Sequence, residues 1–294
     1  MFFINCALFN SFRVYTILNG KNITYKNFLH KVAVSWIEDG ETNFTEQDDN
    51  LPNSEPTRRA PRLDHPGRLS NYGKHKLINI ILAIHGYAQS DVIFKTKLGS
   101  LRKGFKKEVD FTFLRAPHKV PMRTYGWWFN TKDHIFKAVV PSNLAVGFEE
   151  SIVVIEEAFK KFGPFDGILG FSQGAAFATL LCFMQQKNLL QIKFEFAIII
   201  SGFKSLCIPH GIYYDGKISI PSLHIYGRTD QVIPTEMAEE VSEMFINKTN
   251  ITHEGGHYIP SKKEYYKEFI MEMFLNKNKN NYIVYTIMKV YSKV

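Results

Sequence analysis

The pattern of apolar and polar positions changes near Leu77 and divides the chain. Residues 1–36 mix aromatic and polar side chains without a period, and residues 37–75 are first acidic and then rich in proline and arginine. Such a composition buries too little apolar surface to offset the entropy lost on ordering. We therefore expect residues 1–76 to form a largely disordered N-terminal extension.

After Leu77, short apolar runs alternate with segments whose apolar side chains recur at helical spacing. The runs predict strands, and the periodic segments predict helices. Strands are expected over 77–84, 109–114, 165–169, 194–200, 221–226 and 250–253, and helices over 91–106, 143–162, 175–184, 235–247 and 261–274. Buried strands that alternate with helices are typical of a parallel sheet covered on both faces. We therefore predict one α/β domain over residues 77–275 with a mostly parallel central sheet, followed by a basic C-terminal tail over residues 276–294.

The segment Gly170-Phe171-Ser172-Gln173-Gly174 joins the strand predicted at 165–169 to the helix that follows. A Gly-x-Ser-x-Gly match alone is common, but a strand before it and a helix after it are the context of a nucleophile elbow. The flanking glycines allow a turn tight enough to hold the Ser172 hydroxyl where a base can reach it. Asp230 and His257 follow in the order Ser, Asp, His that α/β-hydrolases use.

These three side chains have complementary chemistry. A serine hydroxyl is a weak nucleophile near neutral pH and needs a base, which in turn needs an orienting acceptor. His257 is the candidate base, because the two glycines before it let its loop approach the elbow. Asp230 is the candidate acceptor that holds the His257 tautomer. All three residues follow a predicted strand end, where the reactive groups of parallel sheets gather.

Other histidines and aspartates compete for these roles. His253 is an alternative base, although it falls within a predicted strand, as does His224. Asp215 lies in a predicted turn. Asp166 begins the strand before the elbow and is too close in sequence to swing over it. We therefore prefer His257 as the base, with Asp230 as its partner.

An oxyanion that forms at a substrate carbonyl needs two preorganised hydrogen-bond donors. The backbone N–H of Gln173, at the start of the helix after the elbow, is one candidate. The backbone N–H of Tyr87, in the loop after the strand at 77–84, is the other. Alternatively, His85-Gly86, which precedes Tyr87, forms only a turn that ends the strand and has no part in an oxyanion site.

The segment Gly126-Trp127-Trp128-Phe129 is an aromatic run in an otherwise polar loop. Such a run either lines an apolar pocket or plugs an edge of the core. Because the loop should cross the carboxyl end of the sheet, we predict that Trp127 and Trp128 form a pocket wall for an apolar acyl group. Phe203 and Tyr258, which lie beside other predicted site segments, are expected to join this substrate-binding wall.

The formal net charge of +8 does not indicate a nucleic-acid partner, because of where the charge lies. Residues 276–294 carry +4 and residues 1–76 carry +2, which leaves +2 for the region of the predicted strands. A nucleic-acid surface needs a denser basic patch than that. We expect the basic tail to be a solvated end rather than a contact with nucleic acid or a membrane.

Further features bear on location and on bound groups. The three cysteines are too few for a disulfide framework. The apolar N-terminus lacks a basic start and a small-residue cleavage site, so a signal peptide is not favoured. No apolar run approaches the roughly 20 residues that span a membrane. We therefore expect a cytoplasmic protein without a membrane span, a metal or a cofactor, and find no signal for its oligomeric state.

Taken together, the motifs resemble the fungal serine hydrolase family, the LovG-type esterases, whose animal members include the ovarian-cancer-associated esterases. The resemblance covers about residues 77–274 and lies in His85-Gly86-Tyr87, Trp127-Trp128, the elbow, Ser201-Gly202-Phe203, Asp230 and Gly256-His257. The Trp-Trp loop and the Ser-Gly-Phe segment make it specific, because the elbow motif is shared with acyl-protein thioesterases. The resemblance implies an α/β-hydrolase fold, cofactor-free hydrolysis of esters or thioesters, and catalytic roles for Ser172, Asp230 and His257.

The sequence thus predicts a serine esterase that hydrolyses small-molecule esters with apolar acyl or alkyl groups through an acyl-enzyme on Ser172. An acyl thioesterase with the same triad is the alternative within the same chemistry. A non-catalytic ligand-binding protein on a hydrolase fold is a third possibility, against which the intact triad argues.

Overall fold

The computed structural model describes residues 78–291, with side chains for all of them except Arg123 and residues 278–291. One compact unit, Lys74–Ile283, holds the sheet and the helices that cover it. The extension predicted over residues 1–76 lies outside the described residues. The boundaries predicted for the catalytic domain and the tail stay predictions.

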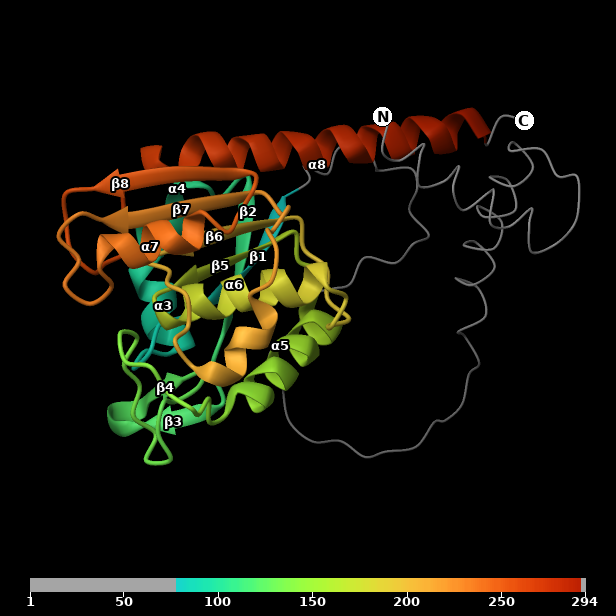
Figure 1. The fold of residues 1–294 in the computed structure, drawn as a ribbon. Coiled ribbons are helices and arrows are strands. Elements are labelled where there is room, and N and C mark those ends of the chain that lie inside the picture. Colours follow the sequence, from blue (N-terminus) through green and yellow to red (C-terminus); the bar gives the residue numbers. More distant parts are fainter. Residues whose placement is uncertain (1–77, 292–294) are drawn as a thin grey trace, which may run out of the picture. The chain divides into compact units, whose positions relative to one another are not determined.

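A six-stranded parallel sheet forms the centre of this unit, which confirms the predicted fold class (Figure 1). Its strand order is β2-β1-β5-β6-β7-β8, and each neighbouring pair is parallel. The bounds are β1 (Asn79–Ile84), β2 (Val109–Leu114), β5 (Gly167–Phe171), β6 (Phe196–Ile200), β7 (Ser222–Gly227) and β8 (Lys248–His253). Since the strands are parallel, the loops that follow them meet at one edge of the sheet.

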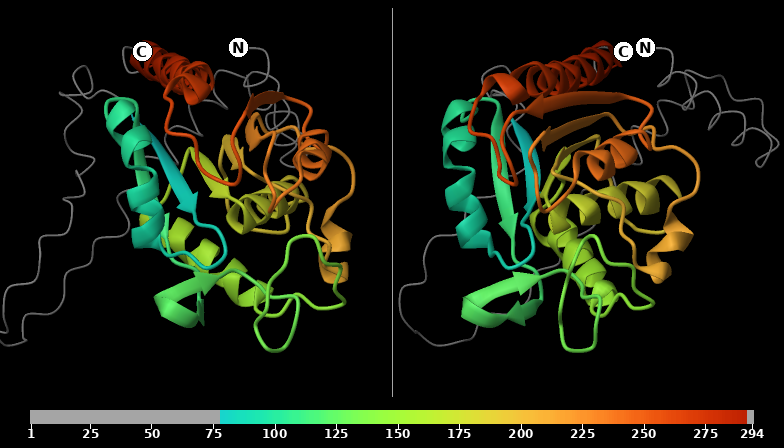
Figure 2. Two further views of the ribbon diagram at one scale, coloured as in Figure 1. Left: turned by 90° about the vertical axis from the view of Figure 1, so that its left-hand side faces the viewer. Right: turned by 60° about the vertical axis from the view of Figure 1, so that its left-hand side comes forward.

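Helices cover both faces of the sheet (Figure 2). One face packs against α5 (Phe148–Phe162), α6 (Gln173–Gln186) and α7 (Thr235–Ser242), and the other against α3 (Asp91–Lys97), α4 (Gly99–Gly104) and α8 (Glu264–Tyr291). The alternation along β1 shows why both faces need a cover. Leu82 and Ile84 enter the first core, and Ile81 and Ala83 enter the second, with no exposed surface on any of the four.

A small hairpin and a long loop lie between β2 and α5. Strands β3 (His118–Val120) and β4 (Thr124–Gly126) pair antiparallel, and a 3-10 turn, η2 (Pro121–Arg123), joins them. The loop that follows is held by an antiparallel bridge between Phe129 and Val146 and a parallel bridge between Ser142 and Cys207. Cys207 directly precedes a second 3-10 segment, η3 (Ile208–Tyr213). The aromatic run after β4 is thus fixed from both ends.

The predicted elements all exist, but some of their ends differ. The helix predicted over 91–106 is split at Leu98 into α3 and α4. Helix α5 begins at Phe148 instead of 143, because Gly147 has a left-handed φ of 84°. Helix α8 continues to Tyr291, through residues predicted as a tail, and no glycine or proline interrupts it.

Asp166 lies just before β5, at the opposite end of that strand from Ser172. Its carboxylate accepts from the backbone N–H of Ile80 and pairs with Lys277 Nζ of α8, both at 2.7 Å. Lys277 also donates to the carbonyl of Ile78. Asp166 therefore anchors α8 to the sheet, at the edge opposite to the loop that holds Ser172.

No helix among the described residues is both long and apolar enough to cross a membrane. The cytoplasmic location expected from the sequence stays a prediction.

Candidate active site

The nucleophile elbow has the geometry that its glycines suggest. Ser172 follows β5, begins α6, and has a φ of 54° and a ψ of −118°, a conformation rarely adopted by residues other than glycine. A Cβ at Gly170 would overlap the backbone of Gly174 and Ala175, and a Cβ at Gly174 would overlap the carbonyl oxygens of Ile84 and His85. The chain can reverse here only because both positions lack a side chain.

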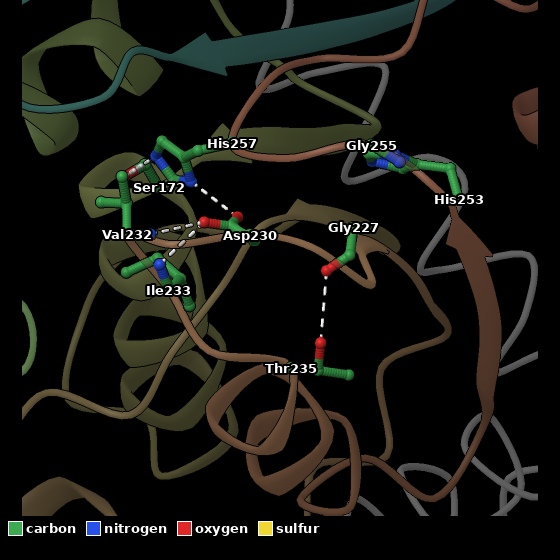
Figure 3. Close-up of polar contacts among 9 residues, drawn as sticks. All are labelled: Ser172, Gly227, Asp230, Val232, Ile233, Thr235, His253, Gly255 and His257. Carbon is green, nitrogen blue, oxygen red and sulfur yellow. Dashed lines mark hydrogen bonds and ion pairs between the residues drawn. The ribbon is translucent and has the colours of Figure 1, made fainter.

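Ser172, His257 and Asp230 form a continuous chain of hydrogen bonds (Figure 3). The distance from Ser172 Oγ to His257 Nε2 is 2.9 Å, and that from His257 Nδ1 to Asp230 Oδ2 is 2.8 Å. The loops after β5, β7 and β8 supply the three side chains, which converge at the carboxyl edge of the sheet. Ser172 is largely buried and keeps 8% of its surface exposed.

Asp230 is held as the partner of an imidazole rather than as a solvated acid. Its Oδ1 accepts from the backbone N–H groups of Val232 and Ile233 at 2.8 and 2.9 Å. Burial of the carboxyl alone would raise its pKa, but the hydrogen bonds from His257, Ile233 and Val232 outweigh this and lower the pKa of Asp230 below its usual value. The carboxylate is therefore ionised near neutral pH and accepts the Nδ1 proton of His257.

The competing residues lie elsewhere. Figure 3 shows His253 on the far side of its loop from Ser172, where its Nδ1 accepts from the Gly255 N–H at 3.2 Å. His224 is buried within β7 and bonds to Ser222 Oγ. Asp215 is solvent-exposed and faces Lys187. None of these three contacts Ser172, so only His257 and Asp230 have the geometry of a base and its acceptor.

The loop after β1 lies directly against the elbow. A Cβ at Gly86 would stand 3.2 Å from the Phe171 carbonyl oxygen and 3.3 Å from Ser172 Cβ. The backbone N–H groups of Tyr87 and Gln173 donate no hydrogen bond to the residues that the structure describes. Both predicted oxyanion donors are therefore unpaired and belong to segments that touch Ser172.

The imidazole of His85 is buried at the root of this loop. Burial lowers the pKa of His85 from 6.5 to about 4, so the ring is neutral near pH 7. Its Nε2 lies 3.1 Å from the backbone N–H of Ala116 and its Nδ1 lies 2.8 Å from the Gly86 carbonyl oxygen. Since Nε2 must accept from Ala116, the proton of the neutral ring is on Nδ1 and is donated to Gly86.

The structure corrects the prediction that the tryptophan pair forms a pocket wall. Trp127 and Trp128 have no exposed surface and Phe203 has 1%, so none of them can contact a substrate in this structure. Both indoles pack on Phe177 of α6, with ring centroids 5.2 and 6.2 Å away. The aromatic run is the core plug that the sequence offered as its alternative.

Other aromatic rings are exposed beside the elbow. Phe136, in the loop between β4 and α5, is partly buried and lies 5.2 Å from the ring of Tyr87, which is also partly exposed. Tyr258 follows His257 in the chain and is 48% exposed, but its ring packs on that of His253, with centroids 4.8 Å apart. Tyr87 and Phe136, and not Tyr258, can therefore offer an apolar surface to a substrate.

Sequence reasoning missed two contributors to the site. Phe136 lies in a short, mostly apolar run over residues 135–140, and its only sequence signal is its place in the segment expected to cross the sheet edge. The side chain of Gln173 was missed as well: its Oε1 accepts from the Trp127 N–H at 3.0 Å, and its Nε2 donates to the Trp128 carbonyl at 2.7 Å. No sequence pattern marks a contact between residues so far apart in the chain.

A metal centre is not found in the part of the chain that the structure describes. No three or more of its His, Cys, Asp or Glu side chains are grouped to hold an ion.

Comparison with known proteins identifies relatives for most of this unit. The family model of the serine hydrolases called FSH1 matches residues 78–269. An Anopheles gambiae esterase is 41% identical over 218 residues, which are 70% of this chain and 81% of that protein. Esterase OVCA2 of Danio rerio is 39% identical over 216 residues, 65% of this chain and 95% of that protein. Human esterase OVCA2 is 33% identical over 218 residues, which are 65% of this chain and 94% of that protein.

Solved structures support the fold alone. Esterase PE8 matches with a TM-score of 0.51 at 21% identity, over 66% of this chain and 92% of that chain. Acyl-protein thioesterase 2 of Zea mays matches with a TM-score of 0.50 at 16% identity, over 68% of this chain and 96% of that chain. Both are similar to this chain in the arrangement of the sheet and its helices.

The elbow makes a prediction about stability. Gly174→Ala should lower the free energy of unfolding by about 1–3 kcal/mol, because the added Cβ forces α6 away from the end of β1. Gly99→Ala is the matched control, since a Cβ at this helical glycine meets nothing within 4 Å. It should be neutral or slightly stabilising. Urea unfolding of both variants measures the difference, and an equal effect would show that the elbow tolerates a side chain.

Proposed function

Since the chain belongs to the FSH1 serine hydrolase family, we propose that it hydrolyses carboxylic esters through an acyl-enzyme intermediate on Ser172. The observation that carries the proposal is the hydrogen-bonded chain from Ser172 through His257 to Asp230. The curated relatives named as esterases support an oxygen ester as the substrate.

The first half-reaction follows from the donors and acceptors of this chain. Ser172 Oγ attacks the ester carbonyl carbon and transfers its proton to His257 Nε2. Asp230 stabilises the imidazolium that results, because its carboxylate is ionised and bonds to Nδ1. The C–O bond to the alcohol then breaks, and the imidazolium returns the proton to the leaving oxygen.

Water completes the cycle in the second half-reaction. His257 Nε2 takes a proton from a water molecule, whose oxygen attacks the acyl carbon on Ser172. The tetrahedral intermediate of each step carries a negative oxygen, for which the unpaired N–H groups of Tyr87 and Gln173 are the proposed donors. When the second intermediate collapses, the bond between the acyl carbon and Ser172 Oγ breaks, the imidazolium returns its proton to Oγ, and the acid is released.

We further propose that the substrate presents an apolar acyl or alkyl group. The rings that support this are those of Tyr87, in the loop that lies against the elbow, and of Phe136 beside it; both are partly exposed, and such surfaces favour apolar groups. The same triad chemistry also cleaves thioesters, which therefore are the alternative substrate class. A purely ligand-binding role does not account for a serine, an imidazole and an ionised carboxylate at hydrogen-bond distances.

Replacement of the nucleophile tests the proposal. Ser172→Ala should lower kcat on a p-nitrophenyl acyl ester by roughly 10⁴- to 10⁶-fold, because no acyl-enzyme can form. Ser201→Ala is the control, since Ser201 also follows a strand and is buried, but its Oγ has no hydrogen-bond partner among the described residues. It should retain most of the activity. Retention of more than about a tenth of the activity by Ser172→Ala would exclude Ser172 as the nucleophile.

A series of acyl chain lengths, measured on paired esters and thioesters, tests the substrate class. Phe136→Ala should lower kcat/KM for long acyl chains roughly tenfold more than for acetyl, because a distant apolar contact is lost. Ile135→Ala, at a neighbouring exposed position, should leave this ratio unchanged. An equal loss at every chain length would remove Phe136 from the substrate surface, and a large preference for thioesters would favour the alternative class.

A further inference from the structure

The two proposed oxyanion donors come from segments that are distant in sequence. Tyr87 lies in the loop after β1, and Gln173 is the first residue of α6. Hydrogen bonds to a developing oxyanion accelerate a reaction only if both donors are already in place when the charge forms. Some part of the protein must therefore hold the loop at a set distance from the elbow helix.

Trp127 connects these two segments directly. Its indole Nε1–H donates to the carbonyl oxygen of His85 at 2.7 Å, and its backbone N–H donates to Gln173 Oε1 at 3.0 Å. One residue thus bonds to the root of the Tyr87 loop and to the residue that carries the second donor.

Trp127 is itself held rigidly. Its carbonyl accepts from Ser151 Oγ of α5 at 2.5 Å. Its ring is fully buried, and its centroid lies 5.2 Å from that of the Phe177 ring and 5.2 Å from that of the His85 ring. With every polar group of Trp127 paired and its ring enclosed, the positions of His85 and Gln173 are fixed relative to each other.

The hydrogen bond from His85 acts on the donor itself. His85 Nδ1–H donates to the Gly86 carbonyl oxygen at 2.8 Å, with the tautomer set by the bond from Ala116 to Nε2. That carbonyl belongs to the same peptide group as the Tyr87 N–H. A hydrogen bond to the oxygen of an amide makes its N–H more positive, because linked hydrogen bonds polarise one another.

We propose that Trp127 and His85 are positioning residues of the oxyanion hole: Trp127 sets the distance between its two donors, and His85 orients and polarises the Tyr87 N–H. This inference rests on the proposed function, because it assumes an oxyanion at Ser172. The inference assigns Trp127 a role in stabilising the transition state, in place of the predicted role in substrate binding.

Trp128 provides an internal comparison. It is the next residue in the chain, is equally buried, and also packs on Phe177. Its indole N–H, however, pairs with the Cys207 sulfur, a weak acceptor, and donates to no oxygen or nitrogen atom of the described residues. The same substitution at the two positions therefore removes a similar ring volume, but only the substitution of Trp127 removes a bond to His85, at the root of the loop after β1.

Trp127→Phe and Trp128→Phe, each in the full-length protein, test the inference with a p-nitrophenyl ester. Loss of one oxyanion donor outright lowers kcat by roughly 10²- to 10³-fold, so loss of its positioning should lower kcat by roughly tenfold or more. KM should change little in Trp127→Phe, because the oxyanion exists only in the transition state. Trp128→Phe should stay within about threefold of wild type in kcat, because this variant leaves the bond from Trp127 to the His85 carbonyl in place.

A boronic acid that forms a tetrahedral adduct with Ser172 gives a second readout. Its inhibition constant should rise in Trp127→Phe by about the factor by which kcat/KM falls, and should be unchanged in Trp128→Phe. Thermal unfolding shows whether the two proteins are equally folded. If Trp127→Phe does not fold, incorporation of benzothienylalanine at Trp127, which replaces the indole N–H with sulfur at nearly constant shape, provides the same test.

Three results would overturn the inference. They are equal losses of kcat in the two variants, a change in KM alone, and unaltered boronic acid affinity in Trp127→Phe. Each of these leaves the proposed function intact if wild-type protein hydrolyses the ester and Ser172→Ala does not. An inactive wild-type protein, or an active Ser172→Ala, would instead overturn the proposed function and the inference with it.

Discussion

The close approach of three backbone segments at the nucleophile elbow is the constraint on which the rest of the site depends. Helix α6 starts so near the ends of β1 and β5 that neither Gly170 nor Gly174 has room for a Cβ. Ser172 takes up the reversal with a positive φ, a conformation that is unfavourable by about 1–3 kcal/mol. The burial of nearly all of α6 keeps this turn in place. The turn presents the hydroxyl at the sheet edge and leaves the Gln173 N–H free.

Around this turn, the charges are distributed as an acyl transfer requires. On one side, Asp230 is kept ionised by its backbone hydrogen bonds and faces the imidazole that gains a proton. On the other side, where an oxyanion is proposed to form, the proposed donors are neutral backbone N–H groups, and the buried His85 ring behind them is neutral as well. A second carboxylate there would repel the oxyanion. The Asp230 side of the site thus favours the positive charge of the imidazolium, and the opposite side favours the negative charge of the oxyanion.

The convergence of Ser172, Asp230 and His257 could be predicted because each lies in the loop after a strand of one parallel sheet, so local patterns were enough to bring them to the same edge. The family and the fold class were also within reach of sequence. The role of Trp127 was not, because an aromatic residue in a loop either faces a substrate or fills the core. Long-range bonds to His85, Gln173 and Ser151 decide this, and no local pattern encodes them. The strands of the β3–β4 hairpin are too short to show a period.

Trapping of the covalent intermediate tests the central claim most directly. Wild-type protein would be quenched with acid during turnover of a p-nitrophenyl ester and analysed by intact mass and peptide mapping. The account predicts a mass increase of one acyl group per chain, located on the peptide that contains Ser172. Sustained turnover without any adduct under conditions where deacylation limits the rate, or an adduct on another residue, would contradict it.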